Sequence, residues 1–383
     1  MSGPHRIAIV HDWLTGMRGG ERCLEVLCDL YPAADLFTLL HRRGSVSAAI
    51  EAHRITPSAL QRLPGVADYY RYLLPLFPAA MARLDVSGYD LVISSSHCAA
   101  MGVRVDPGAC HLAYIHTPMR YIWDLYDEYF GGRISLAGWV MPLLRGYLQR
   151  WDVATAQRPW ALAANSHTVA ERIRRIYGRA ATVIHPPVRT HPFEASDRDD
   201  GYYLIVSSLV PYKRIDTAIA AFNRLRRPLR IVGDGPEARR LQRASGAGIE
   251  FLGWLSDDQV AQQLARCRAL VFPGEEDFGI VPVEAMACGK AVIAYGRGGA
   301  TETIVPLGAA AGRAPTGLFF DRPGADALIA AVERFERERS AFQPAAIRAH
   351  ALAFSEGRFR ERFGAFVDAC VAQWESHAGV RRA

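Results

Sequence analysis

The amino-acid sequence predicts an α/β protein with two doubly wound domains, each a parallel sheet with helices on both faces. Short apolar runs of strand length recur along the chain, and segments with helical spacing separate them. Alternation of this kind is typical of a parallel sheet covered by helices. A polar stretch divides the series in two, and 383 residues are too many for one compact core.

The first series begins with residues 6–10, an apolar run followed by His11, Asp12 and a loop containing glycines. Residues 21–30 then show helical spacing, so the chain opens as strand, loop and helix. The same criteria predict further buried strands at 89–94, 110–115 and 161–164, and residues 182–188 lead into a polar stretch.

The polar stretch 189–200 is the best candidate for a linker. We therefore expect a first domain at 1–188, a second at 201–355, and a C-terminal helix at 356–383 that packs back on the first domain. The second series predicts strands at 202–206, 229–232, 249–252, 269–272 and 291–294. A cleft between two such domains is the expected ligand site.

The composition is that of an ordinary globular protein, with 50% apolar and 22% charged residues. A net charge of +6 suits an anionic partner, but the charge is spread along the chain, which argues against nucleic acid. Only Lys213 and Lys290 are lysines among 45 basic residues, so each lysine is conspicuous.

Seven cysteines stand singly, and no signal peptide or apolar run of ~20 residues is found. We expect reduced thiols and a cytoplasmic protein. Two apolar-aromatic segments with arginines alongside, 69–77 and 136–147, could lie on the inner membrane or hold a lipid-linked acceptor. Ordinary core helices are the favoured interpretation of both.

The segment from Glu276 to Glu284 carries the strongest chemical signal. It follows a predicted strand and precedes a helix expected to start near Pro282. The residues before that helix would therefore offer backbone N–H groups to a phosphate, and Gly279 would permit close approach. Both glutamates could accept hydrogen bonds from sugar hydroxyls. By themselves they could equally be solvated surface acids.

The spacing of these glutamates, with Phe278 and Gly279 between them and residues 285–293 after them, resembles the retaining GT-B glycosyltransferases of family 4. The resemblance implies that Glu276 contacts the transferred sugar and Glu284 the ribose. The backbone of Gly279, Ile280 and Val281 would then meet the diphosphate and the sugar.

The resemblance extends to the segment 207–216, where the family has a lysine that binds the diphosphate; here this is Lys213. An ammonium at a strand end can neutralise a leaving diphosphate. The family commonly has an arginine five residues earlier, where this sequence has Ser208. Arg214 or another cation would take its place.

A run from Tyr114 to Asp124 contains His116, Arg120 and Trp123 after a predicted strand. A single histidine is more often structural. However, this run resembles the mannosyl-transferring branch of the family, in which the histidine touches the donor sugar or stabilises positive charge at its reacting carbon. Arg120 would contact the acceptor or a phosphate, and Trp123 would stack on a sugar or lie in the core.

Two loops complete the expected site. Gly19 and Gly20 resemble the family's glycine loop near the donor phosphates, and His11 and Asp12 at the same strand end could meet the acceptor. The region around Leu255 is where the family holds the nucleobase.

The sequence thus predicts an enzyme that moves a hexose, with mannose favoured, from a nucleotide diphosphate sugar to a glycan or lipid-linked glycan in surface polysaccharide assembly. His116, Lys213 and Glu276 would act in catalysis. The co-substrate would be GDP-mannose, with a UDP-sugar as alternative, and we expect no metal because cations and backbone amides would take its place. An NAD-dependent oxidoreductase or a non-catalytic sugar-binding protein is the alternative from another class, although the G-x-G-x-x-G spacing is lacking.

Overall fold

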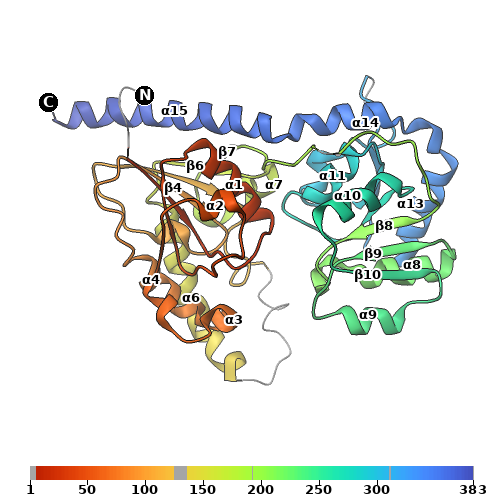
Figure 1. Cartoon of the computed structure of the whole chain (residues 1–383), viewed down its shortest axis with the longest axis horizontal. Coiled ribbons are helices and arrows are strands. Elements are labelled where there is room, and N and C mark those ends of the chain that lie inside the picture. The colour runs from red at the N-terminus through yellow and green to blue at the C-terminus, as the bar shows by residue number, and fades with distance from the viewer. Residues whose placement is uncertain (1–5, 125–135, 192, 310–311, 383) are drawn as a thin grey trace. The chain divides into compact units, whose positions relative to one another are not determined.

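The computed structural model of the chain describes residues 6–124, 136–191, 193–309 and 312–382, which form two compact units. The first unit contains residues 1–187 and 359–383, and the second contains 188–358. Each unit is built on its own parallel sheet, with helices packed against it (Figure 1). The prediction of two doubly wound sheets is confirmed.

The sheet of the first unit has seven parallel strands in the order β3-β2-β1-β4-β5-β6-β7. Sequence patterns predicted the positions of four of these strands, whereas the short β2, β3 and β7 were missed. The strands are β1 (Ile7–His11), β2 (Asp35–Thr38), β3 (Ile55–Pro57), β4 (Leu91–Ser96), β5 (Cys110–Ile115), β6 (Ala161–Ala164) and β7 (Thr182–Val183).

The helices of the first unit include two long ones from distant parts of the sequence, α6 and α15. They are α1 (Gly19–Leu30), α2 (Ala48–Glu51), α3 (Val66–Tyr69), α4 (Phe77–Met81), α6 (Leu136–Ala156), α7 (His167–Tyr177) and, from Phe359 on, α15 (Glu356–Arg382). Three 3-10 helices join them: η1 (Ala59–Arg62), η2 (Tyr70–Leu76) and η3 (Ala100–Gly102).

Side chains alternate between the two faces of this sheet, as strand geometry requires. Ala8 and Val10 of β1 enter one core cluster, and Ile9 enters another on the opposite face. In α15, Phe359 and Phe363 are buried in the Ile9 cluster. Their rings lie 5.6 and 5.9 Å from the ring of Tyr114, measured between centroids. The last helix therefore covers one face of the first sheet.

The sheet of the second unit has six parallel strands in the order β10-β9-β8-β11-β12-β13. Five of them lie within two residues of the predicted ranges, and β13 was missed. The strands are β8 (Tyr203–Val206), β9 (Leu229–Val232), β10 (Ile249–Gly253), β11 (Leu270–Phe272), β12 (Val292–Tyr295) and β13 (Gly317–Phe320).

One hydrophobic core holds this sheet and its helices together. The helices are η4 (Pro211–Lys213), α8 (Ile215–Leu225), α9 (Ala238–Ala244), α10 (Asp257–Arg266), α11 (Ile280–Ala287), α12 (Ala300–Thr303), α13 (Ala325–Arg337), η5 (Arg339–Ala341), α14 (Pro344–Ala351) and η6 (Leu352–Phe354).

The stretch 189–200, for which we expected a linker, makes its hydrogen bonds within the second unit. Lys290 donates from Nζ to the backbone oxygens of Ser196 and Arg198 at 2.7 and 2.5 Å. Asp199 accepts a hydrogen bond from Arg268 at 3.0 Å. This polar stretch is therefore tied to the surface of the second unit.

The two segments considered for membrane contact belong to the first unit. In η2, Tyr70 and Leu74 are buried in the core, whereas Tyr72 and Leu76 are 78% and 49% exposed. The side chains of residues 136–143, in the other segment, lie outside the described residues. Within the described part of the chain, no helix has the length and apolar character to cross a bilayer.

Candidate functional site

In both sheets the strand order reverses in the middle, and several of the polar residues predicted for the site lie near these points. The chain leaves β1 for β2 on one side and leaves β4 for β5 on the other. In the second unit the same reversal separates β8 from β11. The loops that follow such a pair of strands diverge, so a crevice opens at their carboxyl ends. Each unit therefore has one favoured position for a ligand.

In the first unit, the predicted residues His11 and His116 meet at this position through Ser95. His11 on β1 lies opposite Ser95 on β4 in the strand register. The Ser95 hydroxyl lies 3.1 Å from His11 Nδ1 and 2.9 Å from His116 Nε2. One hydroxyl thus joins the two imidazoles.

The carboxylate of Glu21 favours one arrangement of the protons on His11, Ser95 and His116. Glu21 Oε1 lies 3.9 Å from His11 Nε2, which is too long for a hydrogen bond but favours a hydrogen on that nitrogen. His11 Nδ1 then accepts from Ser95, and Ser95 accepts from His116 Nε2. This arrangement leaves Nδ1 of His116 as a hydrogen-bond acceptor.

Burial and neighbouring histidines decide the charge of His116. Burial, followed by the electrostatic influence of the neighbouring His97 and His11, lowers the pKa of His116 to about 3. Burial also acts on His97, but the charge and hydrogen bond of Asp12 outweigh it and raise the pKa of His97. Near neutral pH His116 is therefore an uncharged imidazole.

Gly20, in the first turn of α1, lies directly against these rings. A Cβ atom at this position would stand 3.7 Å from His11, 3.9 Å from His116 and 3.9 Å from His97. Gly19 beside it is exposed. Of these three imidazoles His11 is fully buried, whereas His97 and His116 are half-buried, so the lack of a side chain at Gly20 bears on the access to His97 and His116.

Asp12 has a structural environment, in contrast to the expected contact with an acceptor. It is fully buried, and its oxygens accept hydrogen bonds from four backbone N–H groups, those of residues 97–100, at 2.5 to 3.0 Å. Burial opposes the charge, but His97 and these bonds keep the pKa of Asp12 low. Asp12 thus ties the end of β1 to the loop after β4, and we do not carry it into the proposed site.

Trp123 also has a structural environment. Its indole N–H donates to Asp152 on α6 at 2.8 Å, and its ring packs against the core. Asp124 pairs with Arg172 and Arg175 of α7, each at 2.7 Å. Arg120 lies half-buried in the same loop. These contacts fix the loop that follows His116.

Asp152 is as deeply buried as Asp12 but has fewer partners. Oδ2 accepts from Trp123 and, at 2.9 Å, from the Tyr177 hydroxyl, whereas Oδ1 has no hydrogen-bond partner among the described residues. Burial therefore dominates and raises the pKa of Asp152 to about 7. Asp12, at equal burial, has both the neighbouring His97 and more hydrogen-bond donors, so these partners account for the opposite directions of the two pKa shifts.

In the second unit, Lys213 and Glu276 form an ion pair at the strand-order reversal. Lys213 ends η4 after β8, Glu276 follows β11, and their side chains are 14% and 22% exposed. Lys213 also lies over the Tyr212 ring, with Nζ 5.5 Å from its centroid. The two residues that the sequence separates by 63 positions are thus paired.

Backbone packing fixes the position of Glu276. Gly299 donates from its N–H to the carbonyl of Glu276 at 2.8 Å. Gly298 has φ +66°, and a Cβ there would approach the same carbonyl to 2.3 Å, so a side chain is excluded. The loop after β12 therefore supports the loop that carries the ion pair.

The remaining predicted donor-site residues lie on the same edge of the second sheet. Helix α11 starts at Ile280, two residues before Pro282, because Gly279 takes φ +86° and ends the preceding loop. Ile280, Val281 and Glu284 are half-buried on α11. The two other loops contribute Ser208, which is exposed, Arg214, which is half exposed in a left-handed conformation, and Leu255, which is half-buried.

Sequence reasoning missed Ser95, His97 and Glu21. The signal for Ser95 and His97 was a polar run, 94–97, at the carboxyl end of a buried strand, since polar side chains at such a strand end are candidates for a site. Glu21 was hidden within the first turn of a helix, where acids are common as caps. Indeed, it also accepts from the Arg18 N–H at 3.1 Å.

Comparison with known proteins decides the family. Residues 189–350 match the family described as glycosyl transferases group 1. The O-antigen chain mannosyltransferase C of Escherichia coli is 32% identical over 288 residues, which cover 71% of this chain and 72% of that protein. The chain belongs to this family. The interpretation as an NAD-dependent oxidoreductase is therefore wrong.

Other relatives match over a shorter region. An uncharacterized glycosyltransferase of Methanocaldococcus jannaschii is 35% identical over 115 residues, 29% of this chain and 33% of that protein. A GDP-mannose-dependent alpha-(1-6)-phosphatidylinositol dimannoside mannosyltransferase of Mycobacterium tuberculosis is 36% identical over 113 residues, 28% of each. The match thus spans a third or less of the length of these two relatives.

Solved structures agree on the fold of this family member. Anabaena HepE in complex with UDP has a TM-score of 0.69 at 18% identity and covers 95% of this chain and 100% of that one. At this identity the likeness shows the GT-B fold alone.

The first prediction concerns Gly20. In Gly20→Ala the methyl group would make ordinary van der Waals contacts with the three imidazoles, so the chain should fold with an unchanged or slightly higher Tm. Glycosyl transfer should fall about tenfold or more, because the methyl would cover the half-buried rings of His97 and His116. Gly364→Ala on α15, where a Cβ meets nothing within 4 Å, is the control for both measurements. Full activity of Gly20→Ala would show that no ligand approaches there.

The second prediction concerns Asp152 and pH. Its folded pKa of about 7 lies above the ordinary 3.8, so folded chains bind the extra proton and lose stability as pH rises from about 4 to 7. Asp152→Asn should remove up to roughly 4 kcal/mol of this loss. The Tm advantage of the variant over the wild type should therefore grow between pH 4.5 and 8. An advantage that stays constant with pH would contradict the raised pKa.

Proposed function

We propose that the protein is a retaining mannosyltransferase that uses GDP-mannose and extends a glycan or lipid-linked glycan during surface polysaccharide assembly. Family membership supports glycosyl transfer. The choice of mannose rests on two relatives whose names state mannosyl transfer, one of which is GDP-mannose-dependent and the other an O-antigen enzyme.

The observation that carries the proposal is the Lys213–Glu276 ion pair at the strand-order reversal of the second unit. An ammonium has three hydrogens, and one bond to Glu276 leaves two for phosphate oxygens. The carboxylate keeps lone pairs for sugar hydroxyls. The pair is therefore suited to hold a diphosphate and the adjoining sugar at once.

The start of α11 supplies the second anion-binding element in this proposal. The helix dipole places partial positive charge at Ile280 and Val281, and Gly279 has no side chain to keep a phosphate away. Arg214 adds a cation near Lys213 in the sequence and stands in for the arginine that the family has at the position of Ser208. Glu284 would accept from the ribose, and the loop at Leu255 would hold the base.

In the first unit, His116 is assigned to the donor sugar. A neutral imidazole can approach a reacting carbon that develops positive charge, whereas an imidazolium would repel it. Its acceptor nitrogen, Nδ1, suits a sugar hydroxyl. His11, joined to His116 through Ser95, holds the ring in place, and Gly19 and Gly20 leave room for the ligand.

The proposed reaction breaks the bond between the anomeric carbon and the diphosphate and forms a bond to the acceptor oxygen on the same face. The acceptor's proton passes to the departing phosphate. Lys213, Arg214 and the α11 amides stabilise the charge that builds on this leaving group, and Glu276 positions the sugar. The scheme assigns no step to a metal ion.

A panel of donors tests the proposal. The protein is incubated with GDP-mannose, UDP-glucose, UDP-N-acetylglucosamine or NAD, and both nucleotide release and thermal stabilisation are measured, with and without EDTA. We expect GDP-mannose to give the largest stabilisation and turnover, insensitive to EDTA. Preference for a UDP-sugar would overturn the choice of donor, and stabilisation by NAD alone would overturn glycosyl transfer. Product anomers determined by NMR test retention.

The third prediction uses the two lysines of the chain. Lys213→Ala should lower turnover by a hundredfold or more with little loss of Tm, because the negative charge that builds on the leaving diphosphate is no longer stabilised by the ammonium. Lys290→Ala should lower Tm, because Lys290 is buried and holds the backbone of 196–198, yet keep kcat close to the wild-type value. If Lys213→Ala and Glu276→Ala both stay active, the site assignment fails even where the activity stands.

A further inference from the structure

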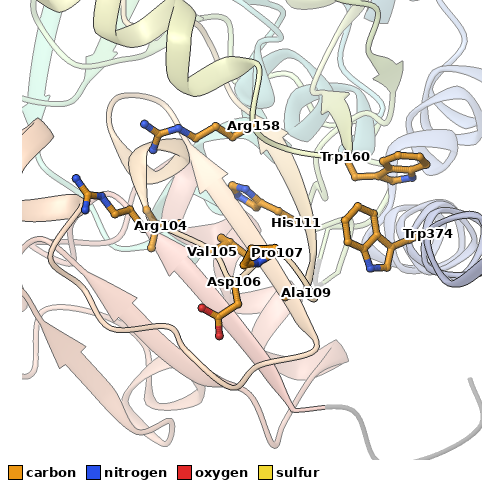
Figure 2. Close-up of a pocket in the computed structure, with 10 residues that line it drawn as sticks. Arg104, Val105, Asp106, Pro107, Ala109, His111, Arg158, Trp160 and Trp374 are labelled. Atoms are coloured by element: carbon orange, nitrogen blue, oxygen red, sulfur yellow. The ribbon is translucent and has the colours of Figure 1, made fainter. Parts of the chain in front are cut away.

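A cavity of about 390 Å³ lies in the first unit, away from the histidine cluster. Its walls come from the loop between β4 and β5, the start of β5, the segment after α6, and α15. Figure 2 shows its labelled side chains, with the guanidinium groups of Arg104 and Arg158 on one side of His111 and the indole rings of Trp160 and Trp374 on the other. The volume is within the range of small-molecule sites.

The cavity lies near the amino end of β5, whereas His116 lies at the carboxyl end of the same strand. His111 is the second residue of β5, and His116 directly follows the carboxyl end of that strand. Five residues of extended chain span roughly 16 Å. A ligand in the cavity therefore occupies a different place from one at the carboxyl ends of β1 and β4.

Two half-buried tryptophans form the aromatic wall. The rings of Trp160 and Trp374 lie 5.3 Å apart between centroids, at an interplanar angle of 74°. Trp160 is held in place by its backbone N–H, which donates to the carbonyl of His111 at 2.7 Å. Such rings offer apolar faces together with an N–H donor. The C–H face of a sugar ring matches a surface of this kind, and its hydroxyls match the donor.

The other wall is cationic. Arg158 donates one bond, from Nη1 to the carbonyl of Gly102 at 3.3 Å, and a guanidinium has five N–H donors. Arg104 is exposed at the cavity. Among the described residues that line the cavity, Asp106 is the single carboxylate, and it accepts from the Gly88 N–H at 3.0 Å. Two guanidinium groups against one carboxylate favour an anionic ligand, and guanidinium geometry suits phosphate or carboxylate.

His111 separates the two walls without adding charge. It is 4% exposed, and Nε2 lies 2.8 Å from the Ser94 hydroxyl. Burial, with the nearby charges of Arg158 and Arg179, lowers the pKa of His111 to about 3. The floor of the cavity is thus neutral at physiological pH.

We propose that this cavity binds an anionic saccharide, namely a sugar ring against Trp160 and Trp374 whose phosphate or carboxylate meets Arg104 and Arg158. A lipid surface is not favoured, because the exposed large apolar side chains of the described residues lie elsewhere, at Leu63, Tyr72, Leu76, Tyr147, Trp254 and Leu352. The natural source would be the glycan acceptor, held at a second point. That source rests on the proposed function, whereas the binding itself does not.

Isothermal titration calorimetry on the full chain tests the proposal with mannose 6-phosphate, mannose and inorganic phosphate. We expect mannose 6-phosphate to bind more tightly than either part alone. Arg104→Ala and Trp374→Phe should each weaken binding about tenfold or more, as expected for loss of a charged hydrogen bond or of an indole wall. Arg83→Ala, an exposed arginine of the same unit outside the cavity, should bind as the wild type does. Lys213→Ala, which removes a cation from the proposed donor site, should retain a mannose 6-phosphate site that Arg104→Ala still weakens.

Four outcomes would overturn the proposal. Unchanged binding in Arg104→Ala excludes the cavity, and loss of binding in Lys213→Ala places the ligand in the donor site. If mannose binds as tightly as mannose 6-phosphate, the cavity does not recognise the anionic group. If inorganic phosphate binds as tightly as mannose 6-phosphate, it does not recognise the sugar ring. Near-UV circular dichroism of Arg104→Ala, a change at an exposed side chain, checks that the fold is intact. None of these measurements involves turnover, so they stand apart from the donor panel.

Discussion

The reversal of strand order in each parallel sheet is the constraint on which the rest of the structure depends. Where neighbouring strands send their connections in opposite directions, the loops at their carboxyl ends part. The reversal lies between β1 and β4 in one unit and between β8 and β11 in the other. Both polar clusters, the histidines and the Lys213–Glu276 pair, lie at these points, whereas the regular strands behind them are apolar.

The loops at these strand ends are held by buried carboxyl groups, and burying a carboxylate costs free energy unless hydrogen bonds or charges compensate it. Asp12 stays charged because four N–H groups and His97 satisfy it, and in return it ties together the two strands on which the first site depends. Asp152 lacks such a supply, so its carboxyl holds a proton near neutral pH and serves the loop after His116 as a partner for Trp123. Two equally buried carboxyl groups therefore differ in protonation: Asp12 is ionised, whereas Asp152 holds a proton up to about pH 7.

The two lysines show how one residue type serves two purposes. Lys290 is buried and directs its ammonium at backbone carbonyls of 196 and 198, which stabilises the path of the chain. Lys213 lies at a strand end, paired with a carboxylate and still partly accessible. An ammonium that carbonyls surround has a structural role. An ammonium that is paired with a single carboxylate at a strand end, such as that of Lys213, can instead bind an anion. In our proposal this anion is a nucleotide sugar, because the chain belongs to a glycosyltransferase family.

The sequence alone determined the fold class and most strand positions, because periodicity is a local property of the chain. It singled out the segments at Lys213 and Glu276 through their positions after strands and their resemblance to the family. It also pointed to His11, His116 and Gly20 by their position after strands. Only the tertiary structure decided that Asp12 and Trp123 are structural and that Ser95, His97 and Glu21 join the histidine cluster. The cavity with Trp160 and Trp374 likewise combines distant segments. Such contacts depend on strand register and side-chain direction, which no short stretch of sequence contains.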